Sequence, residues 1–332
     1  MTRPPARVGY LFALLSAALF GANGTTTKLL VLSGLEPQQL TLFRSMGTAV
    51  LAGAVLLIVN RKAFRMPPRQ LLTMAILGIT GIALLQAFYG GALGRLPVGI
   101  ALLLEYTGVL FVALVGFFVF KEKVKARLWV AIGLVLAGLV VVAELWNSTL
   151  DPLGVVLALG AAVMLTVYFV VGERQVAATS PLAVAFWTGL FAAAFWAIFS
   201  GWWRLSPTIF VKPIDIGGSH GHLDVPLWLP LTSALVLGSF LPFLLGFSAL
   251  KHLPATAAGI VASSEVLFAF LVAFLWLGEG LDLVQLLGAA VVLVGIMLAQ
   301  TARVGKVVDA DLALSPVVVP TPPDVDAAAR RR

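Results

Sequence analysis

Residues 97–120 read PVGIALLLEYTGVLFVALVGFFVF, and Glu105 is the only charged side chain in this stretch. A helix that crosses the hydrocarbon core of a bilayer needs about 20 consecutive, mostly apolar residues. The stretch therefore predicts a membrane-spanning helix. An ionised carboxylate at depth costs on the order of 3 kcal/mol or more unless it is paired or hydrated. Glu105 is for this reason the first candidate for a functional residue.

The composition of the whole chain points to the same solvent. Of its 332 residues, 60% are hydrophobic and only 11% are charged, whereas soluble domains carry about 25% charged residues. A water-soluble domain is thereby excluded, and we expect the bilayer, not nucleic acid, to be the partner of the net charge of +7. The absence of cysteine excludes disulfides and thiolate metal sites. His220 and His222 have no acidic neighbour in the SHGH run, so we expect them to be solvated, with no metal or other cofactor.

Ten apolar segments of spanning length follow one another along the chain. Their approximate bounds are 9–32, 38–59, 71–91, 97–120, 128–145, 153–171, 182–199, 227–250, 254–277 and 283–302. The first segment carries Lys28 where a signal peptide would have a small-residue cleavage site, so we expect it to be retained. Residues 304–332, rich in Pro and Ala, are expected to form a disordered tail.

Positive charges set the orientation of such a chain, because Lys and Arg concentrate on the cytoplasmic side. With residues 1–8 placed in the cytoplasm, 14 of these residues fall at inner helix ends and 4 at outer ends. The four outer ones are Lys28, Arg95, Arg204 and Lys212. The bias predicts a multi-pass protein of the cell membrane with both termini in the cytoplasm.

The chain matches itself when it is shifted by about half its length. Leu96-Pro97 aligns with Leu253-Pro254, and Glu122 aligns with Glu279, without a gap. We infer two five-helix repeats, residues 9–146 and 147–303. Because five is odd, the second repeat enters the membrane from the opposite face. The fold class predicted is thus an all-α membrane protein of ten helices in two inverted repeats, the architecture of alternating-access transporters.

Residues 249–300, ALKHLPATAAGIVASSEVLFAFLVAFLWLGEGLDLVQLLGAAVVLVGIMLAQ, closely resemble the second repeat of EamA-type carriers of the drug/metabolite transporter superfamily. The first repeat resembles the same family through LFGANGTTTKLL, PQQLTLFRSMGTAV and LPVGIALLLEYTGVLFVALVGFFVFKE. The resemblance covers about residues 9 to 302. It implies ten helices, cytoplasmic termini and movement of small metabolites, often export of amino acids. One departure is Val266, where members often have proline after the glutamate, and we expect it to make the ninth helix straighter.

Two opposite charges occur at matched depth in different helices. Glu105 is about 12 Å and Arg44 roughly 10 Å below the outer ends of their helices, at 1.5 Å per residue. The pair forms either a structural salt bridge or part of a charged cavity wall. We favour the cavity, because ionisable residues in membranes usually serve function. Such a cavity would suit an amphoteric substrate.

Further polar residues complete the candidate substrate site. Glu265 is near the midplane, where we expect it to be protonated, to accept hydrogen bonds from Ser263 or Ser264, or to couple protons. Gln86 and Tyr89 could extend the polar wall. Lys28 lies near the outer mouth, where it either snorkels or, as the resemblance implies, lines the path.

Four other polar side chains have structural interpretations. Tyr106 and Thr107 are interpreted as packed or helix-bonded groups. Glu122 and Glu279 are expected beside helix N-termini, which favour anions.

The sequence also limits the class of function. Because it has no GxxxxGK, HExxH or nucleophile-elbow motif, we expect neither an ATP-driven pump nor an enzyme. The favoured function is a secondary carrier exporting amino acids or related compounds. An importer or a proton-coupled exchanger of drugs or organic cations is the alternative within the same class. A non-transporting membrane scaffold is the alternative from another class.

Overall fold

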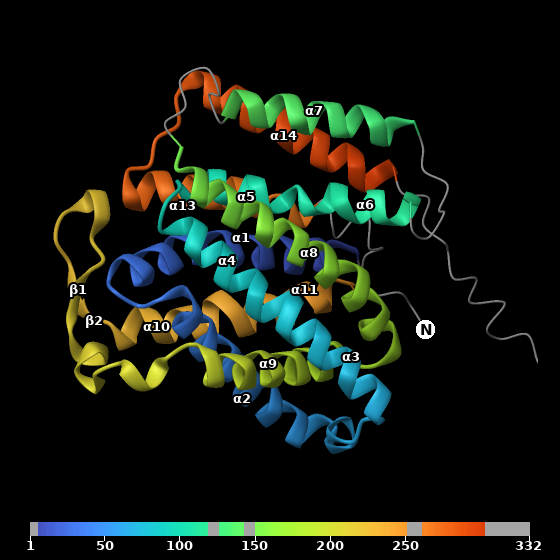
Figure 1. Ribbon diagram of the computed structural model, residues 1–332, viewed down its shortest axis with the longest axis vertical. Helices are drawn as coiled ribbons and strands as arrows, with labels where there is room; N and C mark the ends of the chain where they lie inside the picture. Colours follow the sequence, from blue (N-terminus) through green and yellow to red (C-terminus); the bar gives the residue numbers. More distant parts are fainter. Residues whose placement is uncertain (1–5, 119–125, 143–149, 251–260, 303–332) are drawn as a thin grey trace, which may run out of the picture.

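The computed structural model describes residues 6–118, 126–142, 150–250 and 261–302, and this part of the chain is almost wholly helical (Figure 1). The α-helices are α1 Ala6–Leu32, α2 Pro37–Val59, α3 Pro68–Gly78, α4 Leu85–Leu93, α5 Val98–Tyr106, α6 Gly108–Phe118, α7 Arg127–Val142, α8 Pro152–Ala178, α9 Pro181–Phe199, α10 Trp228–Leu235, α11 Leu241–Leu250, α13 Glu265–Leu277 and α14 Leu283–Ala302. Two π-helical segments, η2 Ile79–Leu84 and η6 Val236–Phe240, join α3 to α4 and α10 to α11. The remaining elements are the 3-10 turns η1 Arg61–Phe64, η3 Trp202–Arg204, η4 Pro207–Val211 and η5 Gly218–His220 and the strands β1 Pro213–Asp215 and β2 Asp224–Pro226.

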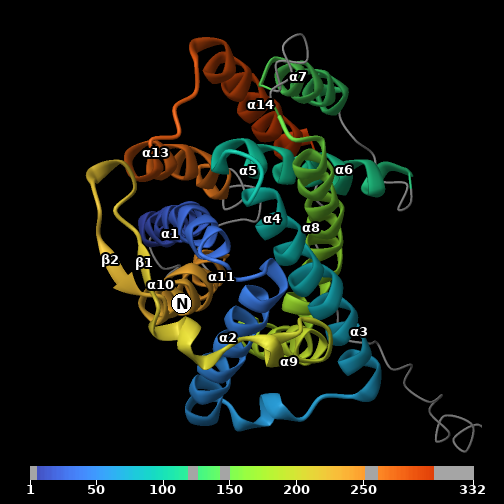
Figure 2. The same ribbon diagram turned by 60° about the vertical axis from the view of Figure 1, so that its left-hand side comes forward.

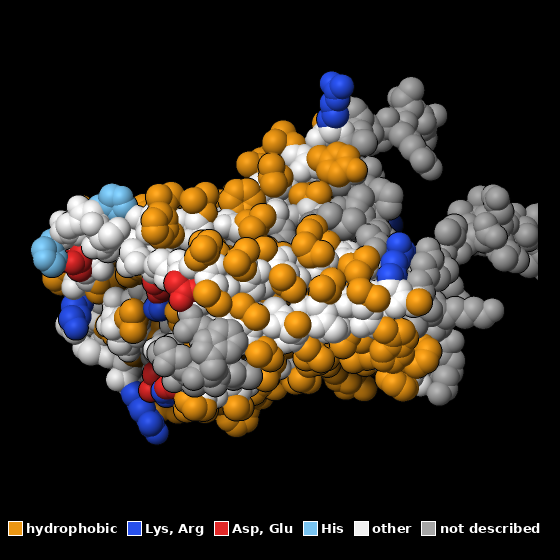
Figure 3. Space-filling model, turned by 90° about the horizontal axis from the view of Figure 1, so that it is seen from above, with side chains coloured by type: hydrophobic (Ala, Val, Ile, Leu, Met, Phe, Trp, Pro, Cys, Tyr) orange, Lys and Arg blue, Asp and Glu red, His pale blue; other side chains and the backbone are white. Residues whose placement is uncertain are grey.

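The helices have the length and composition of a membrane protein. Six described stretches are long and apolar enough to cross a membrane: Arg7–Leu32, Pro37–Val59, Pro68–Leu93, Pro152–Gly172, Pro181–Phe199 and Trp228–Gly246. Four more are apolar but shorter: Val98–Val112, Arg127–Val142, Glu265–Leu277 and Leu283–Ala299. Figure 3 shows hydrophobic side chains over the middle of one face and charged or histidine side chains mostly toward its ends. The prediction of an all-α membrane protein is confirmed, while ten crossings in two inverted repeats stay a prediction.

Several helices begin at a proline that follows a capping residue. Proline suits the first turn because its fixed φ is already helical and no amide hydrogen is needed there. Asp151 precedes α8, and its carboxylate accepts hydrogen bonds from the amides of Leu153 (2.8 Å) and Gly154 (3.0 Å). Ser180 caps α9 through the amide of Ala183 at 3.2 Å. These caps fix where the two helices start.

The helices pack around α5. In Figures 1 and 2, α7 lies beside α14 at one edge of the molecule, and α2 lies beside α9 at the other. Between them, α1 packs against α13 and α11, and α8 packs against α4, α5 and α6. Every residue of α5 is buried. The helix that carries Glu105 is therefore enclosed by protein, so this carboxylate does not face lipid.

The two π-helical segments lie at matching positions of the repeat. The first begins at Ile79 and the second at Val236, and these two residues align under the same shift that aligns Leu96-Pro97 with Leu253-Pro254. A π-helical turn holds an extra residue, so it misaligns the hydrogen-bonding ladder and frees carbonyl groups for other donors. The shared position extends the sequence repeat into local backbone structure.

Two helix interruptions also match. Thr107 ends α5, and its hydroxyl donates to the carbonyl of Leu104 at 2.7 Å. Ser264, at the matching position of the second repeat, donates in the same way to the carbonyl of Val261 at 2.6 Å. The predicted single span over 97–120 is consequently two helices, α5 and α6. Each hydroxyl donates a hydrogen bond to a backbone carbonyl close to the residue at which the regular helix ends.

The expectation of a straighter ninth helix is wrong for the described residues. A turn at Ser263–Ser264 separates the helical residues 261–262 from α13, which begins at Glu265. The loss of proline at Val266 does not restore a continuous helix, because the break lies just before the glutamate, where the Ser264 hydroxyl is bonded to the backbone. Residues 254–260 lie outside the described part.

Candidate functional site

Arg44 is buried in the interior between α2 and the second π-helical segment. Its side chain is 6% exposed. Its Nε donates to Ser239 Oγ at 2.8 Å and Nη2 donates to the Gly238 carbonyl at 3.0 Å. A longer contact of 3.4 Å joins Nη1 to Thr27 Oγ1 of α1. The π-helical segment thus supplies the free carbonyl that orients this guanidinium, and three of its five N–H groups are used.

Glu105 is equally buried, at 7% exposure, but it is not bonded in the same way. Its Oε2 atom has no hydrogen-bonding partner among the described residues. Arg44 and Glu105 influence each other electrostatically, yet they form no salt bridge in the described structure. Of the two alternatives drawn from the sequence, a direct structural ion pair is therefore not the arrangement seen.

Gln86 of α4 is a second acceptor without a partner. Its Oε1 atom is buried and makes no hydrogen bond within the described residues. A buried polar group left without a partner costs about 1–3 kcal/mol. Unpaired acceptors in a protein interior indicate water or a ligand that donates hydrogen bonds.

Glu265 has a partner that the sequence did not indicate. The Tyr106 hydroxyl donates to Glu265 Oε2 at 2.7 Å and joins α5 to the start of α13. Ser264, one of the two serines predicted to bind this glutamate, donates instead to a backbone carbonyl. Tyr106 was interpreted as a packed side chain, so its role was missed. The only signal in the sequence is its place next to Glu105, because the helix break after Tyr106 is itself not predicted.

Tyr89 links the charged residues to one another. It is 9% exposed and interacts electrostatically with Arg44, Glu105, Glu265 and, more weakly, Glu279. A Cβ atom at Gly24 would lie 2.9 Å from the Tyr89 hydroxyl oxygen, so the missing side chain lets the phenol pack against α1. One base, two acids and a phenol from four helices therefore meet in one buried region. Such a set can bind a molecule that carries both charges.

Lys28 lies next to this region, because its ion-pair partner Glu279 also interacts electrostatically with Tyr89. Its ammonium group contacts the Glu279 carboxylate and donates to the Leu96 carbonyl at 2.9 Å. Glu279 also accepts a hydrogen bond from the Val98 amide at 2.8 Å. Lys28 is thus paired, which neither of its two interpretations anticipated. Glu279 lies at the N-terminus of α5 as expected, while Glu122 lies outside the described residues.

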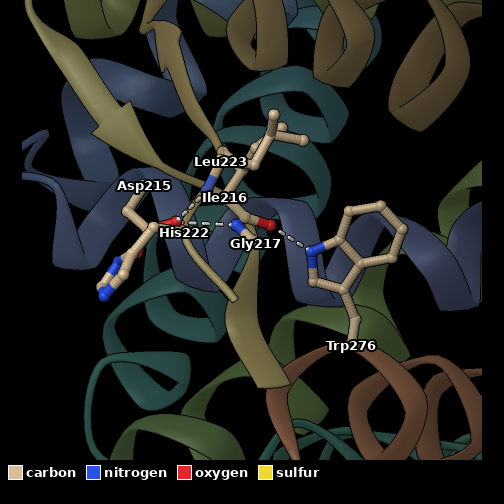
Figure 4. Close-up of polar contacts among 6 residues, drawn as sticks. All are labelled: Asp215, Ile216, Gly217, His222, Leu223 and Trp276. Carbon is tan, nitrogen blue, oxygen red and sulfur yellow. Dashed lines mark hydrogen bonds and ion pairs between the residues drawn. The ribbon is translucent and has the colours of Figure 1, made fainter. Parts of the chain in front are cut away.

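A hairpin lies against the end of α13, a few residues before Glu279 (Figure 1). Strands β1 and β2 pair antiparallel, with Ile214 opposite Val225. Figure 4 shows the Trp276 indole of α13 pointing at the Ile216 carbonyl, with an N–O distance of 2.5 Å. Ser219 donates to the Leu275 carbonyl at 3.1 Å. The segment after β1 is thereby attached to the last turn of α13.

Asp215 organises the tip of this hairpin (Figure 4). Its carboxylate accepts hydrogen bonds from the amides of Leu223 (3.0 Å) and Gly217 (2.8 Å) and contacts His222 Nδ1 at 2.6 Å. These bonds, that of Leu223 first, lower the pKa of Asp215 to about 2. The hydrogen bond to Asp215 in turn raises the pKa of His222. The expectation that the loop histidines lack acidic partners is therefore wrong for His222.

Comparison with known proteins now bears on this geometry. The model of the EamA-like transporter family matches two segments of the chain, residues 7–143 and 152–301. The chain belongs to the EamA-like transporter family. A solved structure titled "Crystal structure of protein" has a TM-score of 0.57 at 19% identity and covers 91% of this chain and 98% of its own. That likeness concerns the fold alone.

Two of the relatives of this EamA-like protein have names that refer to export, and a third is named only as a transporter. The threonine/homoserine exporter RhtA of Salmonella typhimurium is 30% identical over 224 residues, which are 63% of this chain and 68% of the exporter. A probable terminal-alkyne amino-acid exporter of Streptantibioticus cattleyicolor is 27% identical over 72% of this chain and 76% of its own. An uncharacterised transporter of Clostridium kluyveri is 23% identical over 86% and 91%.

Proposed function

We propose that this EamA-like protein is a secondary transporter that exports amino acids or related amphoteric metabolites. The observation that carries the proposal is the Glu105 carboxylate, enclosed in α5 with Oε2 unpaired. An ammonium group would supply the missing hydrogen bond and neutralise the charge, which removes the cost of burying both. Glu105 is accordingly assigned to the substrate's ammonium group.

Arg44 is assigned to the substrate's carboxylate. Its bonds to Ser239, Gly238 and Thr27 leave one N–H on each Nη atom without a partner among the described residues. Two parallel N–H groups match the two oxygens of a carboxylate. The protein bonds hold the guanidinium in place before the substrate arrives, so less conformational entropy is lost on binding.

The proposed cycle uses the two repeats as inverted units that rock around this site. The orientation with both termini in the cytoplasm places the hairpin and the Lys28–Glu279 contact outside the cell. The structure would then be closed on the outside, and release of substrate requires that contact to open. Reporters placed after Lys62 and near Gly217 test the orientation, because the first should be cytoplasmic and the second external.

The names of the relatives support export of amino acids, and a transport panel tests it. Radiolabelled amino acids, nucleosides and cationic dyes are offered to inverted membrane vesicles with and without a pH gradient. We expect accumulation of one or more zwitterionic amino acids. Uptake confined to organic cations would contradict the proposal, and uptake of no compound by proteoliposomes of the pure protein would favour a scaffold.

Proton coupling is a second candidate feature, favoured by the bond between Glu265 and Tyr106. This carboxyl is partly buried beside the site and is already partnered inside the protein, so it suits a proton carrier better than a ligand for the substrate. Glu265→Gln should then abolish the effect of a pH gradient and leave exchange of substrate intact. If the glutamine variant still responds to the gradient, Glu265 only packs.

A further inference from the structure

A groove runs between α2 and α9 on the outer surface of the helix bundle. Its volume is about 460 Å³. It is lined by ten apolar or glycine residues: Met46, Ala49, Val50, Gly53, Ala54, Leu57, Phe64, Phe186, Leu190 and Ala193. Gly53 lies against the Phe186 ring, where an added Cβ would be 3.1 Å away. The small residues of α2 therefore make the hollow, and the aromatic side chain forms its floor.

Basic side chains stand at one end of this groove. Arg61 follows α2, and its Nε donates to the carbonyl of the groove-lining Leu57 at 2.9 Å. This bond turns the guanidinium back toward the last turn of α2, and its Nη atoms have no partner in the described structure. Lys62, Arg65 and Arg69 are exposed nearby in sequence, and none of the three has an acidic partner among the described residues.

The segment that carries this cluster has no negative charge of its own to neutralise it. No Asp or Glu occurs between Glu36 and Glu105. Next to the groove, Ile58 and Val59 are 87% and 72% exposed, as suits residues in contact with acyl chains. An apolar hollow that opens to the bilayer thus ends at an unpaired cationic cluster.

We propose that this groove binds one anionic phospholipid. An acyl chain lies between α2 and α9, and the phosphate is held by Arg61 and the cations that follow it. Basic residues at the end of an intramembrane groove select anionic headgroups, and planar guanidinium groups pair well with phosphate oxygens. The site lies outside the buried region of Arg44 and Glu105, so it stands whether or not amino acids are the cargo.

Trp187 provides a local reporter for this site. Its ring contacts that of Phe186, with centroids 5.1 Å apart, and its indole donates to the carbonyl of Ala63 beside the basic cluster. The chain has eight tryptophans, so the signal of Trp187 is obtained by subtracting the fluorescence of Trp187→Phe. The full-length protein is placed in nanodiscs that contain phosphatidylglycerol or phosphatidylcholine with brominated acyl chains, which quench nearby indoles.

We expect brominated phosphatidylglycerol to quench Trp187 at least twofold more than brominated phosphatidylcholine. Arg61→Gln combined with Lys62→Gln should remove this preference. Arg204→Gln combined with Lys212→Gln, which alters two exposed cations far along the chain, should preserve it.

The groove itself is tested by filling it. Ala54→Leu should reduce quenching by both lipids, while Ala290→Leu on exposed α14 should not. Equal quenching by both lipids in the wild type, or a preference that survives the Arg61/Lys62 variant, would overturn the proposal. So would particles of twice the expected mass in which a second copy covers the groove and no lipid quenches Trp187.

Discussion

At positions that match in the proposed repeat, the two halves of the chain carry different side chains. Gly47 of α2 faces the side chain of Leu235, and Gly78 faces Phe191 of α9. When α2 and α9 are aligned at their first residues, Gly47 corresponds to Phe191. When the two π-helical segments are aligned at their first residues, Gly78 corresponds to Leu235. In each contact a glycine of the first half packs against a large side chain of the second half, but the glycine lies at the first of the two matching positions in one contact and at the second in the other. The volume at the two contacts is therefore similar, although the aligned residues differ.

The carbonyl groups of the two π-helical segments show the functional consequence. In the first, Trp196 donates to the Ala83 carbonyl at 3.1 Å. In the second, Arg44 donates to the Gly238 carbonyl at 3.0 Å. One half thus satisfies its distorted turn with a neutral indole, and the other uses a cation. The same backbone feature is structural in one half and, in our proposal, part of the substrate site in the other.

The two acids inside the helix bundle, Glu105 and Glu265, also differ in their surroundings. The position that matches Glu105 is Ala262, and the position that matches Glu265 is Gly108. Each half therefore contributes one carboxyl at its own place near a helix break. Glu265 is bonded to Tyr106, whereas Glu105 Oε2 is unpaired among the described residues. In our proposal this difference separates their tasks, and the unpaired acid is left for the substrate.

The largest effects are expected from the charged pair. Glu105→Gln and Arg44→Gln should each lower the rate of transport about 10- to 100-fold. This is the effect of losing one hydrogen bond to a charged group, which is worth about 1.5–3 kcal/mol. The double variant should be the weakest, since neither end of the substrate is then held. Initial rates in proteoliposomes measure this. Recovery of the double variant to near the wild-type rate would show that the two residues serve only the fold.

A second comparison removes the donor from each π-helical segment. Arg44→Met should lower the free energy of unfolding by about 1–3 kcal/mol, because it leaves the Gly238 carbonyl without its partner. Trp196→Phe removes one neutral bond and should cost about 0.5–1.5 kcal/mol. Thermal unfolding in detergent gives both values, and transport should survive only in Trp196→Phe. Loss of transport in both variants would mean that the two segments have the same role.

The matched helix breaks allow a finer test. Thr107→Val and Ser264→Ala each remove a hydroxyl bonded to a carbonyl three residues earlier. We expect similar losses of about 0.5–1.5 kcal/mol in unfolding free energy. A loss confined to one variant would show that the two breaks are not equivalent, despite their shared spacing.

The smallest effect concerns the pH dependence of the hairpin. The pKa of His222 is raised in the folded hairpin, so its ion pair with Asp215 stabilises the hairpin fully below about pH 6.5. This stabilisation is lost as the pH rises through the pKa of His222 in the folded state. Asp215, with a pKa of about 2, stabilises the folded hairpin above about pH 3.9, and this stabilisation is lost as the pH falls toward 2. Hydrogen exchange over β1 and β2 should therefore be slower at about pH 5 than at about pH 8, beyond the intrinsic pH effect. His222→Gln should show no such excess, and an unchanged excess would exclude the pair as its cause.

Much of the fold could be predicted from the sequence because apolar length and repeat spacing are properties of the chain itself. The two π-helical segments are separated by the same number of residues as the matching positions of the sequence repeat, although the segments themselves are not predicted from the sequence. The hydroxyl groups of Thr107 and Ser264 bond to the carbonyls of Leu104 and Val261 where the helices are interrupted, but many other hydroxyl residues of the chain lie in uninterrupted helices. Such breaks have no periodic signal of their own.

The candidate site was predicted less completely, for a physical reason. Depth along a helix follows from counting residues, so the buried state of Arg44 and Glu105 was accessible. Which partner a buried group chooses depends on helix rotation and on distant segments, as Tyr106 for Glu265 and Glu279 for Lys28 show. Partners separated by 159 and 251 residues cannot be inferred from local spacing.

The most direct test of the account asks whether Glu105 recognises the ammonium group. Efflux of the amino acid identified by the vesicle panel is compared with efflux of its N-acetyl derivative, which keeps the carboxylate but has no positive charge. The wild type should prefer the amino acid by about 10- to 100-fold, from the charged hydrogen bond at stake. Glu105→Gln should move both compounds slowly and with little preference. A Glu105→Gln variant that keeps the wild-type preference would contradict the assignment of this glutamate to the substrate.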